Sequence, residues 1–520
     1  MSHLIASSSV EIHDNTISCD AFSPEFDFGV LSLKFSKVGI NKTPTFILFT
    51  IDKTGSMLEQ NRIQYVKSTF KNIIDFISTH ENASEIYIRV HTFNDSVDVL
   101  VDTTRVTKNN IDTIIQSIMA IDPDGSTAID LALTESSNTM NEYRDSNPTH
   151  SVFHIFMTDG EPTAGIRNHA SLAELVDTDF PSMFIGFGHA HNSDLLRRLS
   201  DSPIHRYEFV DNMEHTGVVY GNIMHELLYR SISNLEIKVE NGFIYNWVDN
   251  QWVSSIIEQN VVGDSSKFYH LKTTSAVDLA VKIYGTPIDT RGPRILLGSD
   301  MMMPDLENIE TGELQSSRVD LSKYMYRQVV QEIMYKSRSI HSNIAESMRE
   351  NVKKCKKETS DVFSKMRRFM REQNLLTDRM MIQLCDDLCI IHRTIGTQHG
   401  RMFTLAREQS QGRQQSNTVP MTPHPRFPSL ENEDRLSPPR LVRRQTTSNQ
   451  TELLPFISSI TPIRHHLDEN DFSETDYVFS VNSVEEDDIT TYIMDDDPIS
   501  CFASPSAVDT MRSITQSDLY

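Results

Sequence analysis

The sequence has few of the features that mark several classes of protein. Its five cysteines among 520 residues are odd in number and scattered, which argues against a disulfide framework and favours a reducing setting. No apolar run approaches the roughly 18 residues of a membrane span, and the first residues carry no charged and apolar leader. We therefore expect a soluble, intracellular protein, cytoplasmic or, alternatively, nuclear.

Basic residues are also scarce. Lysine and arginine total 48 against 72 aspartates and glutamates, a formal net charge of −24, which argues against a general nucleic-acid binder. The sequence holds no phosphate loop of the Gly-x-x-x-x-Gly-Lys type and no convincing nucleophile–base–acid set. We therefore expect a protein that is not an enzyme.

What the sequence does contain, between residues 45 and 230, is a regular alternation of strand and helix patterns. This alternation predicts a doubly wound α/β domain with a mostly parallel, Rossmann-like sheet. Two strand patterns separated by three polar residues predict a hairpin that adds an antiparallel edge strand. The predicted strands are 45–51, 86–93, 97–102, 151–157, 182–187 and 206–210, and the predicted helices are 60–79, 108–119, 127–142, 169–177, 193–200 and 213–230.

The pattern changes on both sides of this domain. Residues 1–44 contain short alternating runs that predict edge strands or a β lead-in. Residues 231–317 alternate as in a small β domain. Residues 318–407 return to helical periodicity. Residues 408–520 are rich in Ser, Gln, Pro and Asn and then in acidic residues, a composition that predicts a disordered tail.

The end of the first predicted strand in the α/β domain is rich in oxygen ligands. The apolar run from Phe46 stops at Asp52, and Thr54 and Ser56 follow at a spacing of two, which points their side chains the same way. A doubly wound sheet binds its ligands at the carboxyl ends of its strands. Carboxylates and hydroxyls suit a hard cation such as Mg²⁺, which keeps several waters. We therefore predict a metal site at this turn.

Two further ligands are predicted from neighbouring loops. Thr127 opens a helix after a glycine turn, and Asp159 ends the strand expected to lie beside the first. The alternative is that Asp52, Gly55 and Asp159 are ordinary turn residues. That explanation would suffice for one loop, but it is weaker for three loops that converge at strand ends.

These motifs, taken in order, resemble the metal-ion-dependent adhesion site of a von Willebrand factor A domain over residues 45–230. The motifs are Asp-x-Thr-Gly-Ser, Gly-Ser-Thr-Ala-Ile and Thr-Asp-Gly-x-Pro-Thr. The resemblance implies that Thr54, Ser56 and Thr127 reach the metal directly or through water. It implies that Asp52 and Asp159 act mainly through water and as hydrogen-bond partners. The family most often has serine where Thr54 stands, and threonine keeps the hydroxyl.

The resemblance also implies a function. A bound Mg²⁺ or Mn²⁺ would have one position open for an Asp or Glu of a partner protein, which describes a metal-dependent interaction module. The alternatives are a metal-assisted hydrolase and a structural component of a larger complex without a functional metal. Residues 231–284 and the helices after them resemble the intein-like companion region of intracellular members, but a self-splicing cysteine and a terminal His-Asn pair are missing, so splicing is not implied.

Overall fold

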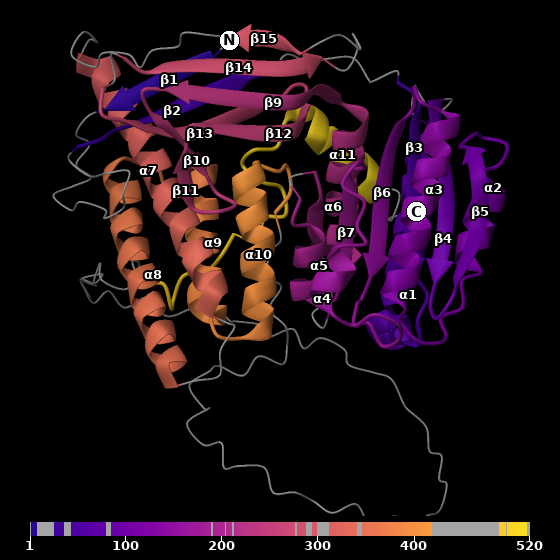
Figure 1. Ribbon diagram of the computed structural model, residues 1–520. Coiled ribbons are helices and arrows are strands. Elements are labelled where there is room, and N and C mark those ends of the chain that lie inside the picture. Colours follow the sequence, from indigo (N-terminus) through magenta and orange to yellow (C-terminus); the bar gives the residue numbers. More distant parts are fainter. Residues whose placement is uncertain are drawn as a thin grey trace, which may run out of the picture. The chain divides into compact units, whose positions relative to one another are not determined.

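The computed structural model (Figure 1) describes residues 2–7, 25–35, 43–79, 85–188, 191–202, 204–210, 213–275, 278–287, 294–298, 311–340, 346–418, 488–495 and 497–516. Within these residues, none of the helices combines the length and the apolar character needed to cross a membrane.

A six-stranded sheet forms the α/β domain, with the order β5-β4-β3-β6-β7-β8. Neighbouring strands are parallel except β4 and β5, which pair as an antiparallel hairpin at the edge. This confirms the predicted doubly wound, mostly parallel sheet. The strands are β3 (Thr45–Asp52), β4 (Ile86–Phe93), β5 (Val97–Arg105), β6 (Ser151–Thr158), β7 (Ser182–Phe187) and β8 (Arg206–Val210).

Helices cover both faces of this sheet because alternate residues of its central strand point to opposite sides. Phe49 belongs to an apolar cluster with residues of α1, α2 and α6, whereas Leu48 belongs to another with Met140 of α3. Phe156 of β6 packs with residues of α3, α4 and α5. The helices are η2 (Gly55–Asn61), α1 (Arg62–Thr79), α2 (Ile111–Met119), α3 (Ile129–Ser146), α4 (His169–Ala173), α5 (Ser193–Leu199) and α6 (Met213–Leu228).

Two smaller antiparallel sheets form the β domain, in the orders β1-β2-β13-β10-β11 and β12-β9-β14-β15. Leu31, Leu235 and Leu271 share its buried apolar core. The strands are β1 (Ser2–Ser7), β2 (Asp27–Lys34), β9 (Arg230–Glu240), β10 (Phe243–Asn246), β11 (Gln251–Val253), β12 (Ser255–Val262), β13 (Ser266–Thr273), β14 (Ala280–Pro287) and β15 (Ile295–Gly298).

The N-terminal strands belong to the β domain, and β1 lies at the edge of its five-stranded sheet, in keeping with the predicted edge strands. β2 pairs along its whole length with β13, from Asp27 opposite Thr273 to Lys34 opposite Ser266. Because β2 precedes the α/β domain in the chain and β13 follows it, the α/β domain is inserted into the β domain. An alternating pattern reveals a half-buried strand but does not reveal the strand that pairs with it. The pairing of β2 with β13 was therefore not predicted from the sequence.

Four helices follow the β domain: α7 (Thr311–Ser339), α8 (Glu346–Glu372), α9 (Arg379–Thr394) and α10 (Gln398–Arg413). α7, α8 and α9 share a core that includes Val330, Phe363 and Leu388, whereas Phe403 of α10 belongs to the apolar cluster of Phe156 in the α/β domain. The helical region was predicted over 318–407, but α7 begins earlier and α10 ends later. At the C-terminal end of α10, Gln414 adopts a left-handed conformation with φ of 53°, as is common after a helix.

The predicted disordered tail does not hold at its two ends. Residues 408–413 belong to α10, and residues 488–495 and 497–516 fold back, with α11 (Pro505–Gln516) packed along α6. Gly217 and Gly221 of α6 permit this approach: a Cβ at Gly221 would lie 2.5 Å from the Cα of Met511. The intervening residues 419–487 lie outside the described part of the chain. The polar and acidic composition of the tail predicted disorder. Composition is an average over the segment, so it does not show that a few apolar residues are spaced to pack α11 against α6.

Segments distant in sequence also meet at Glu208 of β8. Its side chain accepts hydrogen bonds from Gln415 (2.7 Å) and Asn417 (3.5 Å), which follow α10. Glu208 is only 4% exposed, and burial raises its pKa to about 7 even though Arg206 lowers it. The acid is thus partly protonated near neutral pH.

This raised pKa predicts how stability depends on pH. Between the unfolded pKa of about 4.3 and the folded pKa of about 7, the folded chain keeps a proton that the unfolded chain releases, so Glu208 lowers stability as pH rises. The slope is at most about 1.4 kcal/mol per pH unit. Glu208→Gln removes it, so the variant should gain stability over wild type from pH 5 to 7 and no more above that.

Urea unfolding at pH 5, 6, 7 and 8 measures this difference. The matched control is Glu135→Gln on the exposed face of α3, which should follow the wild type throughout. A pH-independent difference between Glu208→Gln and wild type would contradict the prediction.

Candidate functional site

The strand β3 carries Asp52 into the interior of the α/β domain. All eight residues of β3 are buried. One carboxylate oxygen of Asp52 accepts the backbone N–H of Thr54 (2.8 Å), and the other accepts the hydroxyl of Thr158 (2.6 Å). Both carboxylate oxygens of Asp52 thus accept hydrogen bonds from the protein, so Asp52 holds the turn in place. Thr158 was not predicted as a site residue, although it adjoins Asp159 at the end of β6.

The carboxyl of Asp52 has an unusual pKa. Burial, and next the negative charge of Asp159, raise its pKa to about 7, while hydrogen bonds from Thr158 and Thr54 lower it. Two carboxylates in one buried place repel each other and favour a proton on one of them. A cation at this place would favour the ionised form of both.

Ser56 contacts two of the other predicted ligands, Thr54 and Asp159. The Ser56 hydroxyl donates to Oδ1 of Asp159 at 2.9 Å, and the hydroxyls of Ser56 and Thr54 are 3.0 Å apart. Ser56 and Asp159 lie 103 positions apart in the chain. They meet because β3 and β6 are parallel neighbours that end at the same edge of the sheet.

Thr127 is brought to this edge through its backbone. Its carbonyl accepts the N–H groups of Thr163 and Ala164, both at 3.0 Å, and its N–H donates to the Thr163 hydroxyl at 2.8 Å. Gly125, at a φ of 77° that favours glycine, accepts the N–H of Gly55 at 3.3 Å. The three predicted loops therefore adjoin one another, and the metal-binding role of the Thr127 hydroxyl stays a prediction.

The comparison with protein families decides what this domain is. The family profile of the von Willebrand factor type A domain matches residues 47–161, a range that includes Asp52, Thr54, Ser56, Thr127 and Asp159. The chain contains a von Willebrand factor type A domain. Here it is called the A domain.

The chain was also compared with solved structures. A von Willebrand factor type A protein from Catenulispora acidiphila aligns at a TM-score of 0.45 and 11% identity, over 69% of this chain and 85% of that one. The ArnB paralog VWA2 from Sulfolobus acidocaldarius aligns at 0.46 and 12%, over 79% of this chain and 97% of that one. No curated protein matches the chain by sequence.

An arginine that was not predicted also belongs to the site of the A domain. Nη1 of Arg62 lies 2.6 Å from Oδ2 of Asp159, and the two side chains are only 4% and 3% exposed. The Nε and Nη2 groups of Arg62 are buried and have no hydrogen-bond partner among the described residues. Arg62 opens α1, where the helix dipole disfavours a cation. The unfavourable position of Arg62 at the start of a helix is the one feature of the sequence that could have indicated a carboxylate partner.

The oxygen atoms of the site fit a small divalent cation. An octahedron with metal–oxygen distances of about 2.1 Å places adjacent ligand oxygens about 3 Å apart. The contacts of Ser56 with Thr54 and Asp159, at 3.0 and 2.9 Å, have this spacing. Arg62 makes the net charge of the site less negative, because its guanidinium balances one of the two carboxylates, that of Asp159. Among the described residues, no group of three or more His, Cys, Asp or Glu side chains is placed to hold a metal, so the fit rests on hydroxyls as well as carboxylates.

Proposed function

We propose that this chain is a metal-dependent protein-interaction module and scaffold. The A domain would hold Mg²⁺ or Mn²⁺, and an Asp or Glu of a partner protein would complete the coordination. The observation that carries this proposal is the contact of the Thr54, Ser56 and Asp159 oxygens at the spacing of adjacent ligands. The A-domain match supports it, because such domains generally mediate protein–protein interaction and often bind metal.

The residues have distinct roles in this proposal. Thr54, Ser56 and Thr127 would offer neutral hydroxyl oxygens, and Asp159 would supply charge from the end of β6. Asp52 would orient the turn through its bonds with Thr54 and Thr158. The bound cation would supply a fixed positive charge that attracts a carboxylate in one direction. The attraction between the cation and a partner carboxylate would stay strong, because few protein charges surround the cation.

The other parts of the chain would support the A domain. In this proposal the β domain and the helices after it form a scaffold, comparable to an intein-like companion region. The protein would be intracellular and would not be an enzyme.

Calorimetric titration of the full chain with Mg²⁺ tests the metal. Ser56→Ala should weaken Mg²⁺ binding at least about tenfold, because it removes a ligand without changing the charge. Asp159→Ala is less informative, since it also leaves Arg62 buried without its carboxylate. The control is Ser117→Ala on α2, where the hydroxyl bonds only its own helix. Equal Mg²⁺ affinities in wild type and Ser56→Ala, or no Mg²⁺ binding by the wild type, would contradict the proposal.

A second function is favoured by Arg62. Its guanidinium already balances Asp159, so the A domain has an internal cation where a metal would otherwise be needed. The chain would then be a structural component of a larger complex without a functional metal. Affinity capture of partners in Mg²⁺ and in EDTA separates the two: partners lost in EDTA support the metal-dependent module, and partners retained in full support the structural component.

A further inference from the structure

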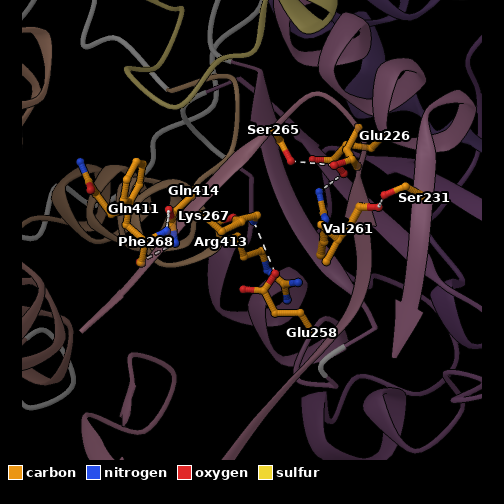
Figure 2. A network of polar contacts seen from close by, with 12 residues as sticks. Glu226, Ser231, Glu258, Val261, Ser265, Lys267, Phe268, Gln411, Arg413 and Gln414 are labelled. Carbon is orange, nitrogen blue, oxygen red and sulfur yellow. Dashed lines mark hydrogen bonds and ion pairs between the residues drawn. The ribbon is translucent and has the colours of Figure 1, made fainter. Parts of the chain in front are cut away.

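A second polar site lies away from the A-domain metal site. A cavity of about 120 Å³ is bordered by β8, by strands of the β domain and by the end of α10. Its lining includes Arg206, Trp247, Glu258, Lys267 and Arg413. Figure 2 shows Glu258, Lys267 and Arg413 gathered together, with Phe268 and Gln414 close by. Gly412 lets α10 lie close to Trp247, because a Cβ at Gly412 would lie only 2.0 Å from the indole ring.

Positive charge dominates the lining of this cavity. Arg206, Lys267, Arg327 and Arg413 contribute four cations, and Glu258 is the single carboxylate among the described lining residues. Glu258 lies 3.5 Å from Lys267, and Glu226, outside the lining, pairs with Arg206. The balance stays positive even when the nearby Glu208 is counted as ionised. A buried excess of one sign is costly and attracts a counter-ion.

Burial and neighbouring charges shift the pKa values of these cations in different directions. Burial lowers the pKa of Lys267 although Glu258 raises it. Burial, and next the positive charge of Arg206, lower the pKa of Arg413 to about 9, although Glu226, Glu258 and Glu208 raise it. Burial lowers the pKa of Arg206 as well, but the negative charges of Glu226, Glu208 and Glu258 outweigh burial and raise it.

Some of these side chains remain within reach of a small ligand. The side chain of Lys267 is 12% exposed, that of Arg206 is 15% and that of Glu258 is 22%. Arg327 is only 2% exposed and donates to backbone carbonyls of Phe268 and Gln411, so it contributes charge rather than contact.

We propose that this cavity binds a phosphate-type oxyanion, either inorganic phosphate or the phosphoryl group of a small molecule. Several cations converge there, and a tetrahedral dianion offers oxygens in more directions than a carboxylate does. Arginine forks and a lysine ammonium are the usual partners of phosphate. Glu258 competes with the ligand for Lys267. The bound anion would join the A domain, the β domain and α10. This site uses none of the predicted metal ligands.

Calorimetry with the full chain at pH 7.5 tests the site, with inorganic phosphate and phenyl phosphate as probes and chloride at matched ionic strength as reference. The wild type should bind a probe saturably at one site. Lys267→Met should weaken binding about tenfold, and Glu258→Gln should tighten it by a similar factor, since each changes one charge beside the anion. Tighter binding of phenyl phosphate would indicate a phosphorylated small molecule, and equal binding would indicate the phosphoryl group alone.

The two opposite shifts guard against simple damage to the fold, because a collapsed cavity would not bind more tightly. The matched controls are Lys282→Met and Glu240→Gln, which alter an exposed ion pair of the β domain by the same charges and should leave the affinity unchanged. The proposal is overturned by absence of saturable binding, by equal affinities in wild type, Lys267→Met and Glu258→Gln, or by equal shifts in the controls.

Discussion

Replacing Arg62 by methionine is expected to make the stability of the A domain depend on divalent cations. The substitution leaves Asp159 buried beside Asp52 with no cation to balance them, and breaking a buried ion pair in this way costs about 3–5 kcal/mol. A divalent cation bound by the same carboxylates would replace the lost charge. Mg²⁺ at about 100 times its Kd restores about 2.7 kcal/mol. The wild type, which keeps Arg62, should gain less from Mg²⁺.

Thermal unfolding in EDTA and in excess Mg²⁺, at matched ionic strength, measures this effect. Arg62→Lys is the control, because it keeps the positive charge and should respond to Mg²⁺ as the wild type does. The same loss of stability for Arg62→Met with and without Mg²⁺ would show that Arg62 only closes a structural ion pair. It would also count against metal binding at Asp159.

Replacing Arg407 by methionine is expected to be the most damaging single change in the helical region. Arg407 of α10 and Asp387 of α9 form an ion pair at 3.1 Å, with side chains only 2% and 0% exposed. Gln411 donates to the other oxygen of Asp387 at 2.9 Å. Without Arg407 the carboxylate is buried and uncompensated, which costs about 3–5 kcal/mol. Urea unfolding at pH 7.5 should show this loss.

Two comparisons separate charge from packing in this prediction. The double variant Arg407→Met with Asp387→Asn removes both charges and should recover much of the loss. Arg379→Met breaks an exposed pair with Asp497, at 57% and 43% exposure, and should cost about 1 kcal/mol or less. If the double variant is as unstable as Arg407→Met, the loss comes from packing and the charge argument is wrong.

Local pattern was enough to predict the α/β domain in detail. The strands predicted at 86–93, 182–187 and 206–210 have the predicted bounds, and β5 is the predicted antiparallel edge. These elements are readable because a strand covered on both faces needs a continuous apolar run, and the intervening helices need a 3.6-residue period. Both requirements involve only neighbouring residues.

Pairing between distant segments could not be predicted in the same way. The pairing of β2 with β13 and the packing of α11 on α6 join segments separated by hundreds of residues. The sequences of these segments show only an alternating pattern or a polar composition, and neither feature identifies the segment that packs against them. The choice of partner depends on register and on the shape of the facing surface, such as the space left by Gly221.

The predicted metal site at the turn after Asp52 depends on both local pattern and distant pairing. The sequence by itself determined that β3 ends in Asp52, that Asp159 directly follows β6, and that Thr54 and Ser56 follow β3. Parallel strands then bring these oxygens to one edge of the sheet. Only the tertiary structure decided the charge there, because α1 folds back and places Arg62 against Asp159, 97 positions away. Strand periodicity is a local property, whereas the pairing of two buried charges depends on which segments the fold brings together.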